Sequence, residues 1–247
     1  MKAMILAAGL GTRLRPLTDH RPKALVEIAG RTLLEITLTR LRTFGVTEFI
    51  INVHHFADMV TDYLKSKNNF GMRIEISRED VLLDTGGGLK KAAWFFLEDQ
   101  TQLDEPFLLH NVDVISNIEL ARMIQFHKEN HALATLAVQS RESSRQLLFN
   151  DELQLSGRGV RGQDPEIVRT STNLQPLAFS GIHVISPRLL PMITEEGVFS
   201  IIPTYLRLAA RNEKILAFRA DEFYWRDLGK PADLSQAALD LPVVAGL

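Results

Sequence analysis

The sequence contains no cysteine among its 247 residues. This absence excludes disulfides, thiolate catalysis and zinc sites built on cysteine. An HExxH motif is also missing, and no histidines cluster at ligand spacing, so we expect no zinc centre. The adjacent His54 and His55 would point to opposite sides of an extended chain, which does not suit a shared ligand.

Long apolar runs and an excess of charge are missing as well. No stretch approaches the roughly 20 apolar residues of a membrane span. The N-terminus also lacks the long apolar h-region of a signal peptide, because the chain enters a short predicted strand at once. The formal net charge of −2 gives no electrostatic reason to expect a nucleic acid or an anionic membrane as partner. With 45% hydrophobic residues, the chain has the composition of a soluble globular protein with a sizeable core. Together with these absences, this composition leads us to expect a cytoplasmic enzyme of small molecules.

The clearest signal lies in residues 4–25. The apolar run from Met4 to Ala8 predicts a buried strand, and Gly9 and Gly11 follow it. Glycine lets the backbone turn sharply and come close to a ligand, and such a loop offers free N–H groups to phosphate oxygens. Arg13 adds a planar cation, and Lys23 a second charge ten residues later. The pattern therefore predicts a phosphate site.

Two common phosphate motifs do not fit this loop. A dinucleotide-binding fingerprint needs a third glycine where Leu14 stands. A P-loop needs Gly-Lys-Ser/Thr, which the loop does not contain. Solvated arginines on an ordinary strand-loop segment remain the alternative.

Residues 9–25 match another signature, glycine-x-glycine-Thr-Arg-Leu-x-Pro-Leu-Thr followed by Pro-Lys-x-Leu. On these residues the chain resembles the sugar-1-phosphate nucleotidyltransferases, whose substrates are a nucleoside triphosphate and a sugar 1-phosphate. The resemblance implies catalytic roles for Arg13 and Lys23, with the Gly9–Thr12 backbone and Arg13 receiving the leaving pyrophosphate. It also implies a set of nucleotide-binding residues here: Leu6, Ala8, Gly9, Gly11, Thr12 and Arg13.

Strand and helix patterns alternate along the chain. Strands are expected at 48–53, 72–77, 107–112 and 132–138, and helices at 32–44 and 57–67, which predicts right-handed crossovers and a parallel sheet. A capping box at Ser116–Glu119 predicts a helix as far as Asn130. Later strands are expected at 176–185, 215–218 and 223–225, and helices at 200–211 and 230–241. The polar stretch 139–175 is expected to hold a short hairpin and a mobile loop.

Taken with the resemblance, this pattern predicts a Rossmann-like α/β/α fold with three layers. Its central sheet would be mostly parallel, with a small added β region. We expect a single nucleotidyltransferase domain over 1–247, with a nucleotide-binding half at about 1–115 and a sugar-binding half at about 116–247. A monomer or homodimer is expected.

A second glycine cluster, Gly86–Gly88, is expected to form a loop before a helix that starts at Leu89. The resemblance places Thr85, Gly86 and Gly87 against the base and ribose, with Glu79 at the base. A flexible turn and a solvated Glu79 are the alternatives. The segment Asp-Thr-Gly-Gly-Gly-Leu-Lys-Lys-Ala is most similar to the corresponding segment of enzymes that use UTP and N-acetylmuramate 1-phosphate. Some GTP-dependent mannose- or heptose-1-phosphate guanylyltransferases look similar.

Two aspartates complete the expected site. Asp113 ends an apolar strand, and Asp227 lies in Trp-Arg-Asp-Leu-Gly-Lys-Pro, which is similar to the family's Trp-x-Asp-x-Gly-x-Pro. The resemblance implies that both carboxylates hold one Mg²⁺, a metal that takes one or two carboxylates plus phosphate oxygens and waters. Each aspartate alone could instead be a helix cap or turn residue. Asn111, Gly181 and Trp225 are expected to bind the sugar.

Two departures from the family pattern concern the sugar. Val112 stands where the family has glycine, so it either narrows the sugar pocket or points into the core. The family's Glu-Lys-Pro segment, which grips the sugar phosphate, is missing, and Arg141, Arg145 and Arg169 are possible substitutes.

Two other functions are the alternatives. The first is a non-catalytic subunit that binds a nucleotide sugar. Such a subunit would be expected to lose at least one of the four expected catalytic residues, but all four are present: Arg13, Lys23, Asp113 and Asp227. A glycosyltransferase would favour an Asp-x-Asp motif, which Asp113-Val114-Ile115 does not supply.

Overall fold

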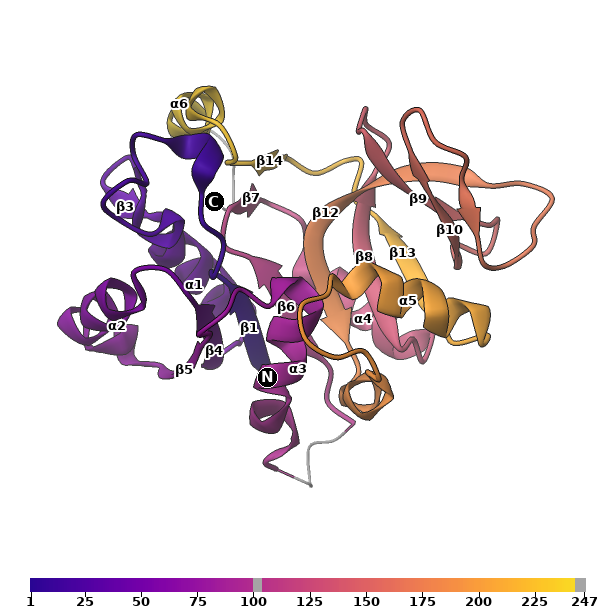
Figure 1. The fold of residues 1–247 in the computed structure, drawn as a ribbon, viewed down its shortest axis with the longest axis horizontal. Helices are drawn as coiled ribbons and strands as arrows, with labels where there is room; N and C mark the ends of the chain where they lie inside the picture. Colours follow the sequence, from indigo (N-terminus) through magenta and orange to yellow (C-terminus); the bar gives the residue numbers. More distant parts are fainter. Residues whose placement is uncertain (100–103, 243–247) are drawn as a thin grey trace.

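The computed structural model describes residues 1–99 and 104–242 (Figure 1). Four parallel strands form one side of the main sheet in the order β5–β4–β1–β6. Their bounds are β1 (Lys2–Leu6), β4 (Glu48–Val53), β5 (Arg73–Arg78) and β6 (Phe107–Asn111). Next to β6 lies the long antiparallel strand β12 (Gln175–Ile185), followed by β8 (Ala134–Gln139) and, parallel to β8, β13 (Ile215–Arg219). The predicted mostly parallel central sheet is confirmed.

A smaller antiparallel arm continues from the start of β12. Residues Gln175–Leu177 pair with β9 (Arg145–Phe149), which pairs in turn with β10 (Leu155–Val160) and then β11 (Glu166–Ile167). The rest of β12 pairs with β8 and β6, so one strand belongs to both the arm and the main sheet. The hairpin expected within 139–175 and the added β region are therefore confirmed.

Helices cover both faces of the main sheet, because side chains alternate along each strand. Ala3 and Ile5 face one core together with α1 (Leu33–Thr43), α2 (Ala57–Ser66), α4 (Leu120–Glu129) and α6 (Pro231–Asp240). Met4 faces the other core, which α3 (Asp84–Leu97) and α5 (Ile201–Ala210) cover. The three-layer arrangement is thus as predicted. None of the described helices is long and apolar enough to cross a membrane.

Two short ribbons complete the described strands. β2 (Glu27–Ile28) pairs with β3 (Arg31–Thr32), just after the first loop. β7 (Val114–Ser116) pairs with β14 (Trp225–Asp227), near the top of Figure 1. This second ribbon joins two segments that lie far apart in the sequence.

The predicted capping box at Ser116 is wrong. Ser116 is a buried residue of β7 opposite Trp225 and lies four residues before the first residue of the helix, so its side chain is not at the N-cap position. α4 begins instead at Leu120, after Glu119, without a side-chain cap. Strand β14 also starts two residues later than expected, at Trp225. These errors share a cause, because the ribbon is a tertiary pairing that local sequence does not specify.

The predicted glycine loop is wrong as well. Residues 84–88 form the first turn of α3, which begins at Asp84 rather than Leu89. The glycines are buried because neighbouring chain packs directly on them. A Cβ at Gly86 would lie 2.4 Å from the Phe199 ring, and one at Gly87 would lie 2.6 Å from the Gly197 carbonyl oxygen. Close packing, rather than a flexible turn, explains these glycines.

Candidate active site

The first glycine loop folds tightly after β1. Gly11 has a φ of 66°, and a Cβ there would lie 3.0 Å from the Thr18 side chain, so only glycine fits well. Thr18 Oγ1 donates a hydrogen bond to the Gly11 carbonyl at 2.9 Å and closes the loop. A short 3₁₀ helix, Thr12–Leu14, follows, with Leu14 buried in the core. Leu14 is therefore a packing residue where a dinucleotide fingerprint would need glycine.

Arg13 extends from this loop toward the end of the chain. Its guanidinium lies over Gly229, where a Cβ would be 2.6 Å from Nη2. Nη2 is also 4.0 Å from Oδ2 of Asp227, and the Arg13 side chain is largely exposed. The guanidinium thus lies at the surface of the site, where an anion can reach it.

Lys23 is almost completely buried, which is rare for a lysine without a partner. Its Nζ donates a hydrogen bond to Oδ2 of Asp113 at 2.5 Å. The partner comes from the end of β6, 90 residues further along the chain. This ion pair ties the first loop to the carboxyl edge of the sheet.

The β7–β14 ribbon brings the two aspartates together. Asp227 pairs with Val114, and the Leu228 N–H donates to the Asp113 carbonyl at 2.8 Å. Burial raises the pKa of Asp227, and the nearby Asp113 raises it further, while Lys23 and Arg13 oppose this shift. Oδ1 of Asp227 is buried and has no hydrogen-bond partner within the described chain. Four residues predicted to be catalytic therefore lie in one place: Arg13, Lys23, Asp113 and Asp227.

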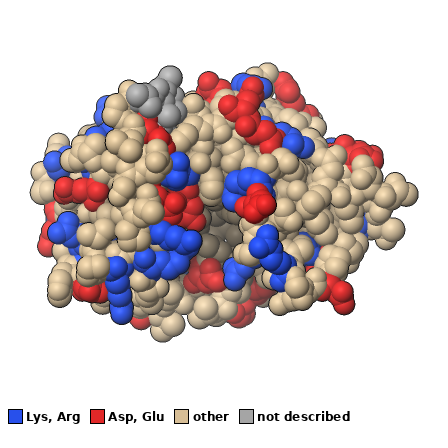
Figure 2. Space-filling model, turned by 90° about the horizontal axis from the view of Figure 1, so that it is seen from above, with Lys and Arg blue, Asp and Glu red and all other residues tan. Residues whose placement is uncertain are grey.

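A large cavity of about 850 Å³ opens beside these charges. Figure 2 shows the hollow from above, with acidic and basic side chains around it. Asn111, Gly181 and Trp225, the predicted sugar-binding residues, all line it together with Arg13, Asp113 and Asp227. Val112 is buried in the core, so the valine does not narrow the cavity.

The wall of this cavity bends at Gly181, whose φ is 75°. A Cβ at that position would lie 2.9 Å from Asn111 Nδ2 and 3.0 Å from the Val114 side chain. Trp225 Nε1 donates to the neighbouring Ser180 carbonyl at 2.7 Å and holds the indole against β12. The wall is therefore formed by β12, the end of β6 and the β7–β14 ribbon.

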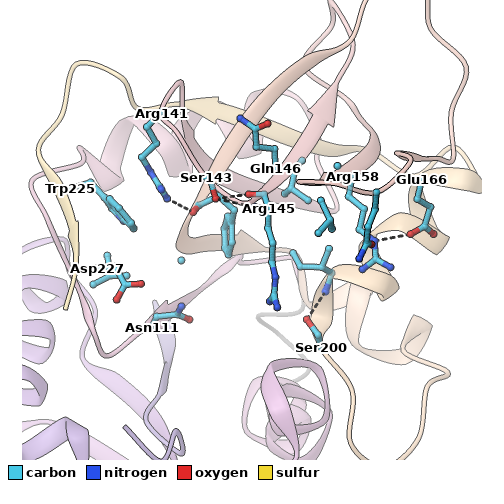
Figure 3. A pocket seen from close by; sticks show the side chains of 18 of the residues that line it. Asn111, Arg141, Ser143, Arg145, Gln146, Arg158, Glu166, Ser200, Trp225 and Asp227 are labelled. Carbon is cyan, nitrogen blue, oxygen red and sulfur yellow. Dashed lines mark hydrogen bonds and ion pairs between the residues drawn. The ribbon is translucent and has the colours of Figure 1, made fainter. Parts of the chain in front are cut away.

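The three candidate arginines lie in different places. Arg141 stacks on Trp225, 3.8 Å from the ring centroid, and donates to the Phe179 carbonyl at 2.7 Å. Burial lowers its pKa, and the carboxylate of Asp227 opposes that shift. Arg145 enters the same cavity from β9 (Figure 3). Arg169 lies outside it and donates to the carbonyls of Ala209 and Glu213, which makes it a structural residue.

A second cavity, of about 280 Å³, lies between the end of β1 and the start of α3. Its lining contains four residues predicted to bind the nucleotide: Leu6, Ala8, Gly9 and Thr85. Asn52 also lines it and was missed by sequence reasoning, although a polar residue near the end of the apolar strand 48–53 is a signal. Its Oδ1 accepts from the Ala7 N–H at 2.7 Å, which fixes the end of β1.

Glu79 is buried, so the alternative of a solvated glutamate is wrong. Its carboxylate accepts hydrogen bonds from Asn52 Nδ2 at 2.8 Å and from the Leu83 N–H at 2.9 Å. The N–H groups of Gly86 and Gly87 both donate to the Phe199 carbonyl. All these groups are used within the protein, so their contact with a nucleotide stays a prediction.

Comparison with known proteins finds sequences similar to this chain. The family model described as nucleotidyl transferase matches residues 2–147. N-acetylmuramate alpha-1-phosphate uridylyltransferase of Caulobacter vibrioides is 35% identical over 93% of this chain and 92% of its own length. Mannose-1-phosphate guanyltransferase of Yarrowia lipolytica is 30% identical over 94% of this chain, which spans 62% of that relative's length.

The solved structures support the same fold. HddC of Yersinia pseudotuberculosis, crystallised with GMP-PN, superposes with a TM-score of 0.76 and 21% identity over 97% of this chain and 99% of its own. The three-layer architecture and the mixed sheet are therefore shared with structures of this kind.

Proposed function

The chain belongs to the sugar-1-phosphate nucleotidyltransferase family, and on this premise we propose that it transfers a nucleotidyl group from a nucleoside triphosphate to a sugar 1-phosphate. The products are a nucleoside diphosphate sugar and pyrophosphate. One observation carries the proposal: Arg13, Asp113 and Asp227 line the large cavity, and the buried Lys23 is bonded to Asp113 beside it, while Gly9 of the same first loop lines the small cavity. The small cavity suits a base and ribose, and the large one suits a sugar.

In the proposed reaction, an oxygen of the sugar 1-phosphate attacks the α-phosphorus of the nucleotide. A new P–O bond forms as the bond to the β-phosphate oxygen breaks, and the electron pair leaves with pyrophosphate. The attacking phosphate is already ionised, so the reaction needs no side-chain base. Catalysis then depends on positioning and on neutralising negative charge.

The first loop supplies the charges for the leaving group. The exposed guanidinium of Arg13 can bind the pyrophosphate through bidentate hydrogen bonds. The N–H groups of Gly9 and Gly11 have no partner in the described chain, so they can bind its oxygens as well. Lys23 holds Asp113 in place through the hydrogen bond from its Nζ, and we propose that its charge faces the attacking group.

Asp113 and Asp227 are proposed to hold Mg²⁺. The donors fit, because both are hard carboxylate oxygens and Oδ1 of Asp227 is buried without a partner in the described residues. No group of three acidic, His or Cys ligands occurs in the described chain, so the remaining ligands would be phosphate oxygens and waters. When bound, the metal neutralises charge on the α-phosphate.

The division into halves fits the cavities. The small cavity is lined mainly by residues of the first 115, and most of the large cavity is lined by residues after 116. We therefore propose a nucleotide half at about 1–115 and a sugar half at about 116–247, within one domain.

The favoured substrates are UTP and N-acetylmuramate 1-phosphate. The Caulobacter relative with that name matches nearly the full length of both chains. GTP with mannose or heptose 1-phosphate is the second candidate, because several relatives at about 30% identity are named mannose-1-phosphate guanyltransferases.

Pyrophosphate release from a matrix of nucleoside triphosphates and sugar 1-phosphates tests the proposal. Release with one pair, lost in EDTA and in Asp227→Asn, is the expected result. Silence across the matrix while a nucleotide sugar still binds by calorimetry would overturn the catalytic proposal in favour of a non-catalytic binding subunit.

A further inference from the structure

Arg145 lines the large cavity but has no role in the proposed transfer reaction. Arg145 begins β9, and its side chain runs into the middle of the cavity between Asn111 and Ser200 (Figure 3). Arg141 and Trp225 lie nearer to Asp227, on the side of the reacting phosphates (Figure 3). Arg145 therefore faces the part of the cavity that is left for the sugar's own substituents.

The backbone at Arg145 is held firmly. Its N–H donates to Ser143 Oγ at 3.2 Å, and that hydroxyl donates back to the Arg145 carbonyl at 2.7 Å. Arg145 also pairs with Val160 across the β9–β10 hairpin, and β9 pairs with β12 on its other side. These contacts fix the backbone position from which the exposed Arg145 side chain extends into the cavity.

The charge of Arg145 is not balanced locally. Its neighbour Arg158 forms an ion pair with Glu166 at 2.7 Å, and Arg141 lies in the field of Asp227. Arg145 has no carboxylate within 4.0 Å in the described residues, although Asp164 also lines the cavity. A guanidinium held in this way suits an anion on the ligand.

Resting on the proposed function, we propose that Arg145 binds a second anionic group of the sugar 1-phosphate and selects an acidic sugar over its neutral counterpart. Its planar fork matches a carboxylate or a phosphate, each of which can accept two hydrogen bonds from it. A cavity of about 850 Å³ leaves room for such a substituent beside the ring. Arg145 is then a specificity-determining residue rather than a catalytic one.

Matched substrates separate this role from general catalysis. N-acetylmuramic acid 1-phosphate differs from N-acetylglucosamine 1-phosphate only by its lactyl ether, which carries the carboxylate. Glucuronic acid 1-phosphate and glucose 1-phosphate form a second pair, and glucose 1,6-bisphosphate tests a second phosphate. The readout is the ratio of kcat/KM for the acidic sugar to kcat/KM for the neutral one.

The expected result is a ratio above 10 in the natural protein that falls by about 10- to 100-fold in Arg145→Met, since a hydrogen-bonded charge is lost. Arg145→Lys keeps the positive charge but loses the planar guanidinium, so its kcat/KM ratio should lie between those of the natural protein and Arg145→Met. Arg161→Met is the matched control, because Arg161 lies at the end of the same hairpin, outside the cavity lining. The ratio should not change in this control.

The outcomes are distinct. A ratio that responds equally to Arg145→Met and Arg161→Met would overturn the inference, because it would then reflect overall charge. An active enzyme whose ratio ignores Arg145 would overturn the inference and leave the proposed function standing. No pyrophosphate from any substrate would overturn the proposed function itself. A response confined to glucose 1,6-bisphosphate would support the anion subsite and assign it to a phosphate.

Discussion

Replacing Gly229 with alanine should impair catalysis through Arg13 alone. A Cβ at Gly229 would lie 2.6 Å from Arg13 Nη2, 2.8 Å from Cζ and 2.9 Å from Nη1. Non-bonded atoms settle at about 3.5 Å, so the guanidinium must move by roughly 1 Å. Its side chain is exposed and can move without disturbing the core, so thermal stability should hardly change.

The catalytic cost follows from that displacement. A misplacement of about 1 Å can cost roughly 10²-fold in rate, and removing one charge-stabilising donor costs about 10²- to 10³-fold. We expect kcat for pyrophosphate release to fall about 10- to 100-fold in Gly229→Ala and at least 100-fold in Arg13→Ala. The double variant should be no slower than Arg13→Ala, because the clash needs the guanidinium.

The double-mutant cycle decides the case. Multiplied losses in the double variant would show that Gly229 acts by another route, and the argument through Arg13 would then be refuted. Full activity of Gly229→Ala, with an unchanged melting temperature, would show that the position of the Arg13 guanidinium does not limit turnover.

Three further outcomes follow from the structure. Asp113→Asn and Asp227→Asn should each lower kcat by at least about 10²-fold, and titration calorimetry with Mg²⁺ and nucleotide should show weaker metal binding, because a hard oxygen ligand loses its charge. Gly86→Ala should lower stability by about 1–3 kcal/mol in urea unfolding, because a Cβ would lie 2.4 Å from the Phe199 ring and 2.9 Å from its carbonyl oxygen. His127, buried and bonded to Thr135 and Ser186, has a pKa lowered to about 4 by burial, so the folded chain binds its proton less readily than the unfolded chain. The free energy of unfolding therefore keeps the full contribution of His127 above pH 6.5 and loses it as the pH falls toward 4. Between pH 8 and pH 5 the free energy of unfolding should fall by about 2 kcal/mol.

Each of these outcomes has its own control. Metal binding that survives both amide variants would remove the aspartates from the proposed magnesium site. Gly159→Ala, where a Cβ meets no atom within 4 Å, should be nearly neutral, and equal losses at Gly86 and Gly159 would exclude close packing as the cause. His127→Gln should flatten the pH dependence of unfolding, whereas His20→Gln on the surface should not. If the free energy of unfolding of His127→Gln depends on pH in the same way as that of the natural protein, His127 is not the source of the pH dependence.

The elements that the sequence predicts well are those set by local pattern. The strand Glu48–Val53 appears with the predicted bounds, because its apolar run needs no knowledge of its neighbours. The first loop was predicted as a phosphate site from Gly9, Gly11, Arg13 and Lys23 and from the family signature in residues 9–25. The structure brings Arg13 and Lys23 close to the two aspartates, and phosphate binding there stays a prediction. The meeting of Asp113 and Asp227 came only from the family resemblance, since 113 residues separate them.

The features that the sequence did not reveal depend on packing at long range. Three glycines in a row suggest a loop, yet Phe199 and Gly197 press on them and a helix starts there. Glu79 looks like a surface residue until Asn52 and Leu83 are seen to bond its carboxylate. Arg141, Arg145 and Arg169 are alike in sequence, and only their tertiary contacts distinguish them. Arg141 stacks on Trp225, Arg145 lines the large cavity, and Arg169 bonds to the carbonyls of Ala209 and Glu213.

The β7–β14 ribbon also has a consequence for synthesis of the chain on the ribosome. Asp227 joins Asp113 only through this late pairing, although the first loop and Asp113 are made much earlier. At about 5–20 residues per second, Asp227 is translated roughly 6–23 s after Asp113. During that interval the nascent chain carries one of the two carboxylates. A product that ends between β13 and residue 227 keeps every strand of the main sheet but lacks Asp227, so under the proposed mechanism we expect it to release no pyrophosphate.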